Sequence, residues 1–134
     1  MIKYKSGYKY QLAENYRVQI PIKGTTIRQG PIKLTVQGWL TIKKGYAWDG
    51  PSGPAIDTKN FMRGSLVHDA LYQLMRHKRL SAIKYRDQAD QLLRAMCQAD
   101  GMSWLRAWWV YQAVRTFAAR AATEKNKRPI LTAP

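Results

Sequence analysis

The chain has 134 residues, of which 46% are hydrophobic, so it is long enough for one compact domain with a modest core. Its 23 lysines and arginines against 8 acidic residues give a formal net charge of +15, which favours nucleic acid, anionic lipid or an acidic protein as partner. The single cysteine, Cys97, excludes a disulfide within this sequence. We expect neither a secretory signal nor a transmembrane helix, because no stretch is long and apolar enough.

The first 48 residues predict a small antiparallel β-sheet. Apolar and polar residues roughly alternate in YRVQIPI and KLTVQGWLTI, which is the period of strands with one buried face. Proline cannot donate to a strand ladder, so we expect Pro21 and Pro31 at strand ends or edges. The predicted strands cover residues 8–12, 16–22, 32–34 and 36–42.

The second half of the chain predicts three helices. Helical spacing begins at Ser65, the expected N-cap of a first helix over 65–79. A second helix, 82–100, should stop at Gly101, and a third should run from Trp104 to about 123. Strands followed by helices predict an α+β fold. We expect a single domain with a β-rich part (1–48), a turn (49–64), a helical part (65–123) and a tail (124–134).

Acidic residues concentrate in the middle of this basic chain, where six of the eight lie between positions 49 and 100. A hard cation such as Ca²⁺ prefers carboxylates together with backbone carbonyls from a turn that can bend around it. Asp49, the carbonyls of the GPSG turn that follows it, and Asp69 form one candidate set of ligands.

A His-Asp pair opens the first predicted helix. His68 and Asp69 point about 100° apart, whereas Tyr72 follows His68 by four residues and shares its face. A histidine that acts as a base needs a second group to fix its tautomer. If the first two helices pack antiparallel, either Asp87 or Asp90 of the second helix can meet His68 and Tyr72.

Two resemblances are carried by these residues. The whole chain resembles a family of uncharacterised proteins from tailed-phage and prophage genomes, whose hallmark is a WDG-x-S-x-P turn followed by S-L-V-H-D-x-L-Y. Residues 46–96 in turn resemble the phospholipase A2 active site of the bacterial and parvoviral-capsid types, through the turn WDGPSGP, the motif H-D-x-x-Y at His68–Tyr72, and a later Ala-Asp pair. Asp90 follows His68 by 22 residues, close to the viral spacing, which favours Asp90 over Asp87.

The phospholipase resemblance implies a phage-encoded, calcium-dependent hydrolase of phospholipid esters. In that reading His68 deprotonates the attacking water, Asp90 orients the imidazole and Tyr72 bonds to that carboxylate. Ca²⁺ would be held by Asp69 and the turn, with Asp49, Gly50 and Ser52 as the implied positions. The sequence departs from the secreted enzymes in lacking their disulfides and in a shorter loop, where Pro51 removes one N–H donor.

The third predicted helix carries aromatic and basic residues at helical spacing, the pattern of an interfacial helix that contacts an anionic phospholipid membrane surface. A helix packed on the protein with its arginines in solvent has the same pattern, so both interpretations stay open. The candidate contact residues are Trp104, Arg106, Trp108, Trp109 and Arg115.

Two other functions remain open from the sequence. The His-Asp residues can be an architectural network in a non-enzymatic phage structural or host-interaction protein, with virion components as partners. The net charge also suits a nucleic-acid-binding accessory protein, although no helix-turn-helix, zinc-finger or RNP-like motif is present. We expect the protein in the host cytoplasm or the virion, and we expect Cys97 to be inert core.

Overall fold

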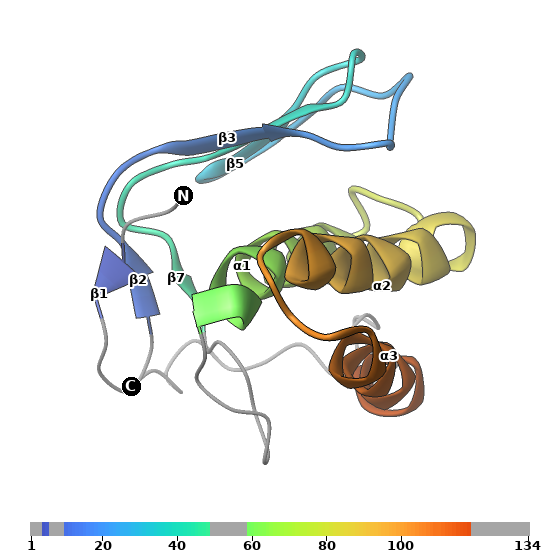
Figure 1. Ribbon diagram of the computed structural model, residues 1–134. Coiled ribbons are helices and arrows are strands. Elements are labelled where there is room, and N and C mark those ends of the chain that lie inside the picture. Colours follow the sequence, from blue (N-terminus) through green and yellow to red (C-terminus); the bar gives the residue numbers. More distant parts are fainter. Residues whose placement is uncertain (1–3, 6–9, 49–58, 119–134) are drawn as a thin grey trace. The chain divides into compact units, whose positions relative to one another are not determined.

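The computed structural model describes residues 4–5, 10–48 and 59–118, and it divides into a β unit up to residue 49 and a helical unit from residue 50 (Figure 1). Strands precede helices, so the predicted α+β class is confirmed. The boundary between the units falls at the end of the β-rich part of the sequence. That the two units form one domain stays a prediction.

The β unit contains two antiparallel sheets where the sequence predicted one. Strands β1 (Tyr4–Lys5), β2 (Tyr10–Leu12) and β7 (Ala47–Trp48) form a three-stranded sheet in the order β1-β2-β7. Strands β3 (Tyr16–Gln19), β6 (Trp39–Ile42), β5 (Ile32–Leu34) and β4 (Ile27–Gln29) form a four-stranded sheet in that order. The predicted strands were too long at 16–22 and 36–42, and β1, β4 and β7 were missed.

Alternating burial explains the register of the four-stranded sheet. Ile32 pairs with Ile42 and Leu34 pairs with Leu40, and all four side chains are fully buried. A shift of one residue would turn this set to the opposite face, so the apolar pattern fixes the pairing. Pro31 lies in the turn between β4 and β5, at a strand end as predicted.

The turn between β5 and β6 depends on Gly38. Its φ is 89°, and its carbonyl accepts a hydrogen bond of 2.8 Å from the N–H of Ile20. A Cβ built at this position would lie 2.4 Å from the carbonyl oxygen of Ile20, which is backbone and cannot rotate away. The four-residue connection from β5 to β6 therefore excludes any side chain at position 38.

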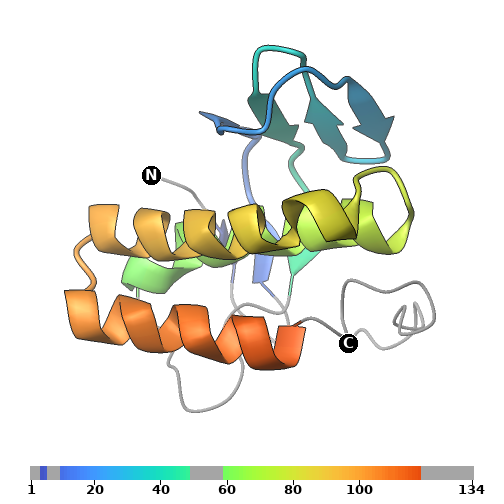
Figure 2. The same cartoon turned by 90° about the vertical axis from the view of Figure 1, so that its right-hand side faces the viewer.

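The helical unit consists of α1 (Lys59–Arg76), α2 (Ala82–Ala99) and α3 (Trp104–Ala113), followed by the π-helical turn η1 (Val114–Ala118). The helices α2 and α3 lie side by side in both views (Figures 1 and 2). Contacts join early α1 to late α2, as between Gly64 and Cys97, so these two helices run antiparallel. The second helix ends as predicted, with Gly101 at a φ of 102°.

The first helix begins six residues earlier than its sequence pattern indicated, so the prediction of a turn over residues 59–64 was wrong. Ser65 is not an N-cap: it lies inside α1 and donates its hydroxyl to the carbonyl of Met62. The place of Gly64 inside α1 is set by packing, because an added Cβ would lie 2.9 Å from Leu93 Cδ1. Glycine here allows α1 and α2 to approach closely.

The core of the helical unit joins all three helices. Phe61 of α1, Leu93 and Cys97 of α2, and Ala107 and Val110 of α3 form one buried cluster with Met102. Burial raises the pKa of the Cys97 thiol to about 12, so the thiol stays protonated and behaves as a small apolar side chain. This agrees with the expected place of Cys97 in the core.

We predict that Gly38→Ala lowers the free energy of unfolding by about 2–4 kcal/mol, from the strained φ together with the clash at Ile20. Gly24→Ala is a matched control, because Gly24 has a φ of 86° but nothing within 4 Å of an added Cβ. It should cost only about 1–2 kcal/mol, the strain alone. Equal losses in guanidinium unfolding would contradict the close approach at Gly38.

Candidate active site

The face of α1 that looks toward α2 carries the predicted base. His68 and Tyr72 are four residues apart, and their ring centroids lie 4.2 Å from each other. Both side chains are buried, with residues 6% and 2% exposed. Apolar neighbours on the same helix, among them Leu71 and Leu74, are fully buried and hold this face in place.

Asp90 of α2 is the centre of the site, because its side chain is fully buried and accepts from three different side chains. His68 Nε2 lies 2.7 Å and the hydroxyl of Tyr72 2.5 Å from Asp90 Oδ1. Arg115 donates Nη1 to Asp90 Oδ2 at 2.9 Å. A buried carboxylate is stable only when such donors replace its water, and the three partners do so for Asp90.

The acceptor character of Asp90 fixes the orientation of the imidazole. A carboxylate can only accept, so the hydrogen of neutral His68 must sit on Nε2. The lone pair is then on Nδ1, at the other edge of the ring, 4.0 Å from Asp69 Oδ1. His68 therefore has Nε2 fixed by one carboxylate and Nδ1 facing a second, more distant one, and Nδ1 of the neutral ring can accept a proton as a general base requires.

The surroundings of His68 also favour its protonated form. Burial by itself lowers the pKa of the imidazole, because it disfavours charge. The neighbouring carboxylates Asp69 and Asp90 outweigh it and raise the pKa above the ordinary value of 6.5. Burial, and next the bond to Asp90, raise the pKa of Tyr72, so its hydroxyl remains a donor. An imidazolium formed at His68 is thus stabilised from both sides.

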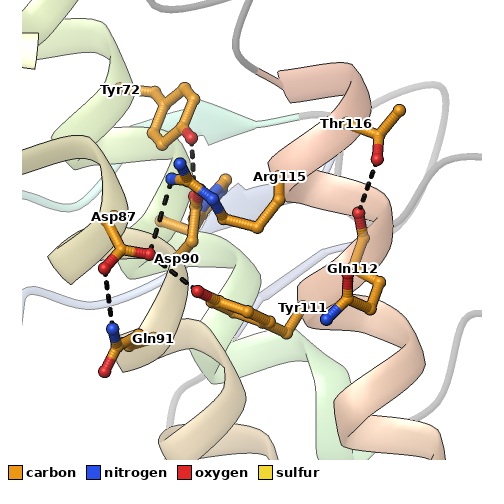
Figure 3. A network of polar contacts seen from close by, with 9 residues as sticks. Tyr72, Asp87, Asp90, Gln91, Tyr111, Gln112, Arg115 and Thr116 are labelled. Atoms are coloured by element: carbon orange, nitrogen blue, oxygen red, sulfur yellow. Dashed lines mark hydrogen bonds and ion pairs between the residues drawn. The ribbon is translucent and has the colours of Figure 1, made fainter.

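Arg115 links this buried centre to the protein surface. Its Nη1 lies 2.9 Å from Asp90 Oδ2 and 3.6 Å from Asp87 Oδ1 (Figure 3). Asp87 also accepts from Tyr111 and Gln91, each at 2.7 Å. The bond from Tyr111 is the main reason that the pKa of Asp87 lies below its ordinary value. Arg115 is in η1, and π-helical turns often occur where a side chain is directed at a functional site.

The structure brings together three of the predicted site residues and separates others. His68, Tyr72 and Asp90 form one hydrogen-bonded group, as expected from the sequence. Asp87, the alternative to Asp90, is about half exposed and bonds to Tyr111 and Arg115. Asp69 is about one-third exposed and lies beside His68 Nδ1. Asp49, Gly50 and Ser52 lie outside the described residues.

The predicted membrane-contact residues do not all share one environment. Trp104, Trp108 and Trp109 are exposed, and Arg106 is partly exposed. Arg115, however, directs its guanidinium to Asp90 and Asp87, so its charge is already paired within the helical unit. Its polar role was missed because aromatic and basic residues at helical spacing gave no sign of which arginine turns inward.

Arg86 of α2 is a second cation beside the site that the sequence did not single out. Its charge lies close enough to the Tyr72 hydroxyl to oppose the rise in the pKa of that group. In the described part of the chain, Arg86 Nη1 is buried without a hydrogen-bond partner. Arg86 therefore places a positive charge near Tyr72 and has one buried nitrogen that is not hydrogen-bonded to any described residue.

Of the expected calcium ligands, Asp69 is the one that lies within the described residues. The described residues contain no group of three or more His, Cys, Asp or Glu side chains that could hold a metal ion. Asp69 offers a partly exposed carboxylate beside His68, which suits a hard cation. The remaining ligands implied by the resemblance belong to the turn 49–52, so a complete set requires that turn.

A family model described as "Protein of unknown function (DUF1353)" matches residues 31–114, more than half of the chain. The chain belongs to the DUF1353 family. No curated protein and no solved structure matches it. The matched region of the DUF1353 protein includes His68, Tyr72 and Asp90 and ends one residue before Arg115. Among the described residues of this DUF1353 chain, no helix is both long and apolar enough to cross a membrane.

We predict that Arg115→Met lowers the free energy of unfolding by about 2–4 kcal/mol, because it leaves the buried Asp90 short of its cationic partner. Arg115→Lys should recover part of this loss, since a lysine keeps the charge but not the planar donor group. Arg106→Met is the control, because it removes the same charge from α3 without removing a partner of Asp90. Equal, small effects of the two methionine variants would contradict a stabilising Arg115–Asp90 bond.

Proposed function

We propose that this protein is a phospholipase A2-like hydrolase of phospholipid esters in which His68 activates water. The single observation that carries the proposal is the orientation of His68. Its Nε2 is bound to the buried Asp90, which leaves Nδ1 as the proton acceptor beside Asp69. The resemblance of the turn and of H-D-x-x-Y to phospholipases A2 supplies the substrate class.

The chain's own residues provide the proton transfers. His68 Nδ1 takes a proton from water as the water oxygen bonds to the ester carbonyl carbon. The imidazolium is stabilised through Nε2 by Asp90, which the bonds from Tyr72 and Arg115 hold in its orientation. When the ester C–O bond breaks, Nδ1 returns its proton to the departing alcohol oxygen, so the imidazole is regenerated.

Calcium fits the proposal through its oxygen ligands. Asp69 and, from the resemblance, Asp49, Gly50 and Ser52 would hold it. A bound Ca²⁺ would polarise the ester carbonyl and stabilise the negative charge that develops on its oxygen. The resemblance to tailed-phage proteins supports a phage-encoded enzyme that acts in the host cytoplasm or as part of the virion.

An architectural role is the second candidate, and one specific observation favours it. Asp90 is fully buried with three donors, and the His68 side chain is only 7% exposed. Such a network ties α1, α2 and η1 together whether or not a substrate is bound. In that case the protein would be a non-enzymatic phage structural or host-interaction component, and calcium would have no effect on it.

We predict release of fatty acid from anionic phospholipid vesicles that requires both Ca²⁺ and His68. His68→Ala should reduce the rate at least about 100-fold, because it removes the general base. Asp69→Asn should have a comparable effect and should weaken calcium binding measured by calorimetry. Titrated fatty acid, with and without chelator, gives the rate.

His77→Ala is the matched control, because His77 is the only other histidine in the chain and lies just beyond the end of α1. It should keep the wild-type rate. If folded wild-type protein released no fatty acid and bound no calcium, the architectural role would replace the enzymatic one.

A further inference from the structure

The outward face of α3 is apolar and uncovered. Trp104, Leu105 and Trp109 are 60%, 61% and 64% exposed, and Trp108 is 38% exposed. At about 100° per residue these four side chains cover about 140° of the helix circumference. We call them the tryptophan face.

The opposite side of α3 is apolar as well. Ala107 and Val110 are buried in the core cluster with residues of α1 and α2. Large apolar side chains therefore lie on two sides of α3, and the polar residues between them are Arg106, which is partly exposed, and Gln112, which is exposed. Large contiguous apolar patches are uncommon on isolated proteins and mark interaction sites. Packing within the helical unit thus buries one side of α3 and leaves the tryptophan face exposed. We therefore expect this face to bind a partner.

The charges around this face select an anionic partner. Between residues 59 and 118 the sequence has ten lysines and arginines but four acidic residues. Three of these four carboxylates are bound internally: Asp100 by Arg63, and Asp87 and Asp90 by Arg115. No acidic residue lies on α3. The Arg94 guanidinium lies 5.5 Å from the Trp104 ring centroid, and Arg106 is on α3 itself.

We propose that the tryptophan face, with Arg94 and Arg106, docks on an anionic lipid bilayer. The helix would lie in the plane of the membrane, with tryptophan and leucine side chains at the boundary between headgroups and acyl chains. The arginines would meet lipid phosphates, adding electrostatic attraction to apolar burial. This inference rests on the proposed function for its biological sense, because it would bring the site to its substrate, but the docking itself needs no catalysis.

The composition of the face favours lipid over other anionic or apolar partners. A nucleic-acid surface needs cations spaced along the phosphate backbone, whereas α3 contributes Arg106 alone within its ten residues. Leu105 has no stacking role for bases but does gain from burial in acyl chains. A second copy of the chain would bring another net charge of +15, which opposes self-association.

Flotation with lipid vesicles tests the docking directly. Full-length protein would be mixed with vesicles of phosphatidylcholine alone or with added phosphatidylglycerol, in chelator to prevent hydrolysis. We expect binding to the phosphatidylglycerol vesicles that weakens as salt rises. The double variant Leu105→Gln, Trp109→Gln should bind at least about tenfold more weakly, because it removes two large apolar side chains from the interface. Circular dichroism would confirm that it is folded.

Ile83→Gln is the matched control, because Ile83 is a fully exposed apolar residue on α2, outside the tryptophan face. It should bind as wild type does. Unchanged vesicle binding by the double variant would overturn the inference. The inference would also be overturned if the double variant bound vesicles normally but lost self-association in sedimentation, because the face would then bind a second copy. Loss of DNA retention alone would likewise assign the face to nucleic acid.

The same assay separates this inference from the proposed function. His68→Ala should float with anionic vesicles as wild type does, because His68 is buried and not part of the face. Face-dependent docking without any fatty-acid release would uphold the surface and reject the hydrolase. If the double variant hydrolysed lipid at the wild-type rate and bound vesicles as wild type does, the docking surface would be rejected and the hydrolase upheld.

Discussion

The buried charge of Asp90 is the constraint on which the rest of the helical unit depends. An ionised carboxylate without solvent is costly unless hydrogen-bond donors surround it. Here those donors come from α1 and from η1, two segments on either side of α2 in the sequence. Three helical segments are therefore held to one residue, and changing the position of any one of them leaves a charge or a donor unpaired.

This requirement determines how closely the helices pack. His68 and Tyr72 reach Asp90 only if α1 and α2 approach each other, and Gly64 permits that approach one turn earlier on α1. Leu93 and Cys97 fill the space beside Gly64 and continue into the cluster that contains Ala107 of α3. The apolar core and the polar network thus have the same geometric origin, a short distance between α1 and α2.

The sequence predicted the centre of the site because helical spacing and a short connection are local properties. His68 and Tyr72 share a face at a spacing of four residues, and a turn of five residues brings α2 back alongside α1. The periodicity alone left Asp87 and Asp90 equivalent, and only the resemblance favoured Asp90. The start of α1 was misjudged because Ser65 has the local character of an N-cap, whereas the helix already includes Gly64, which packs against Leu93 of α2. The strand lengths failed for a similar reason: apolar alternation continues through the turn that Gly38 makes.

Arg115 could not be assigned from the sequence because its direction depends on a change of helix type. Helix α3 and η1 are continuous, but the wider π-helical turn changes the direction in which Arg115, its second residue, leaves the helix axis. In this way one segment has two separate tasks. Its first two turns expose the tryptophan face, while its end returns Arg115 to the buried carboxylate. Arg115 therefore connects the segment that carries the tryptophan face to Asp90, which in turn bonds to Nε2 of His68.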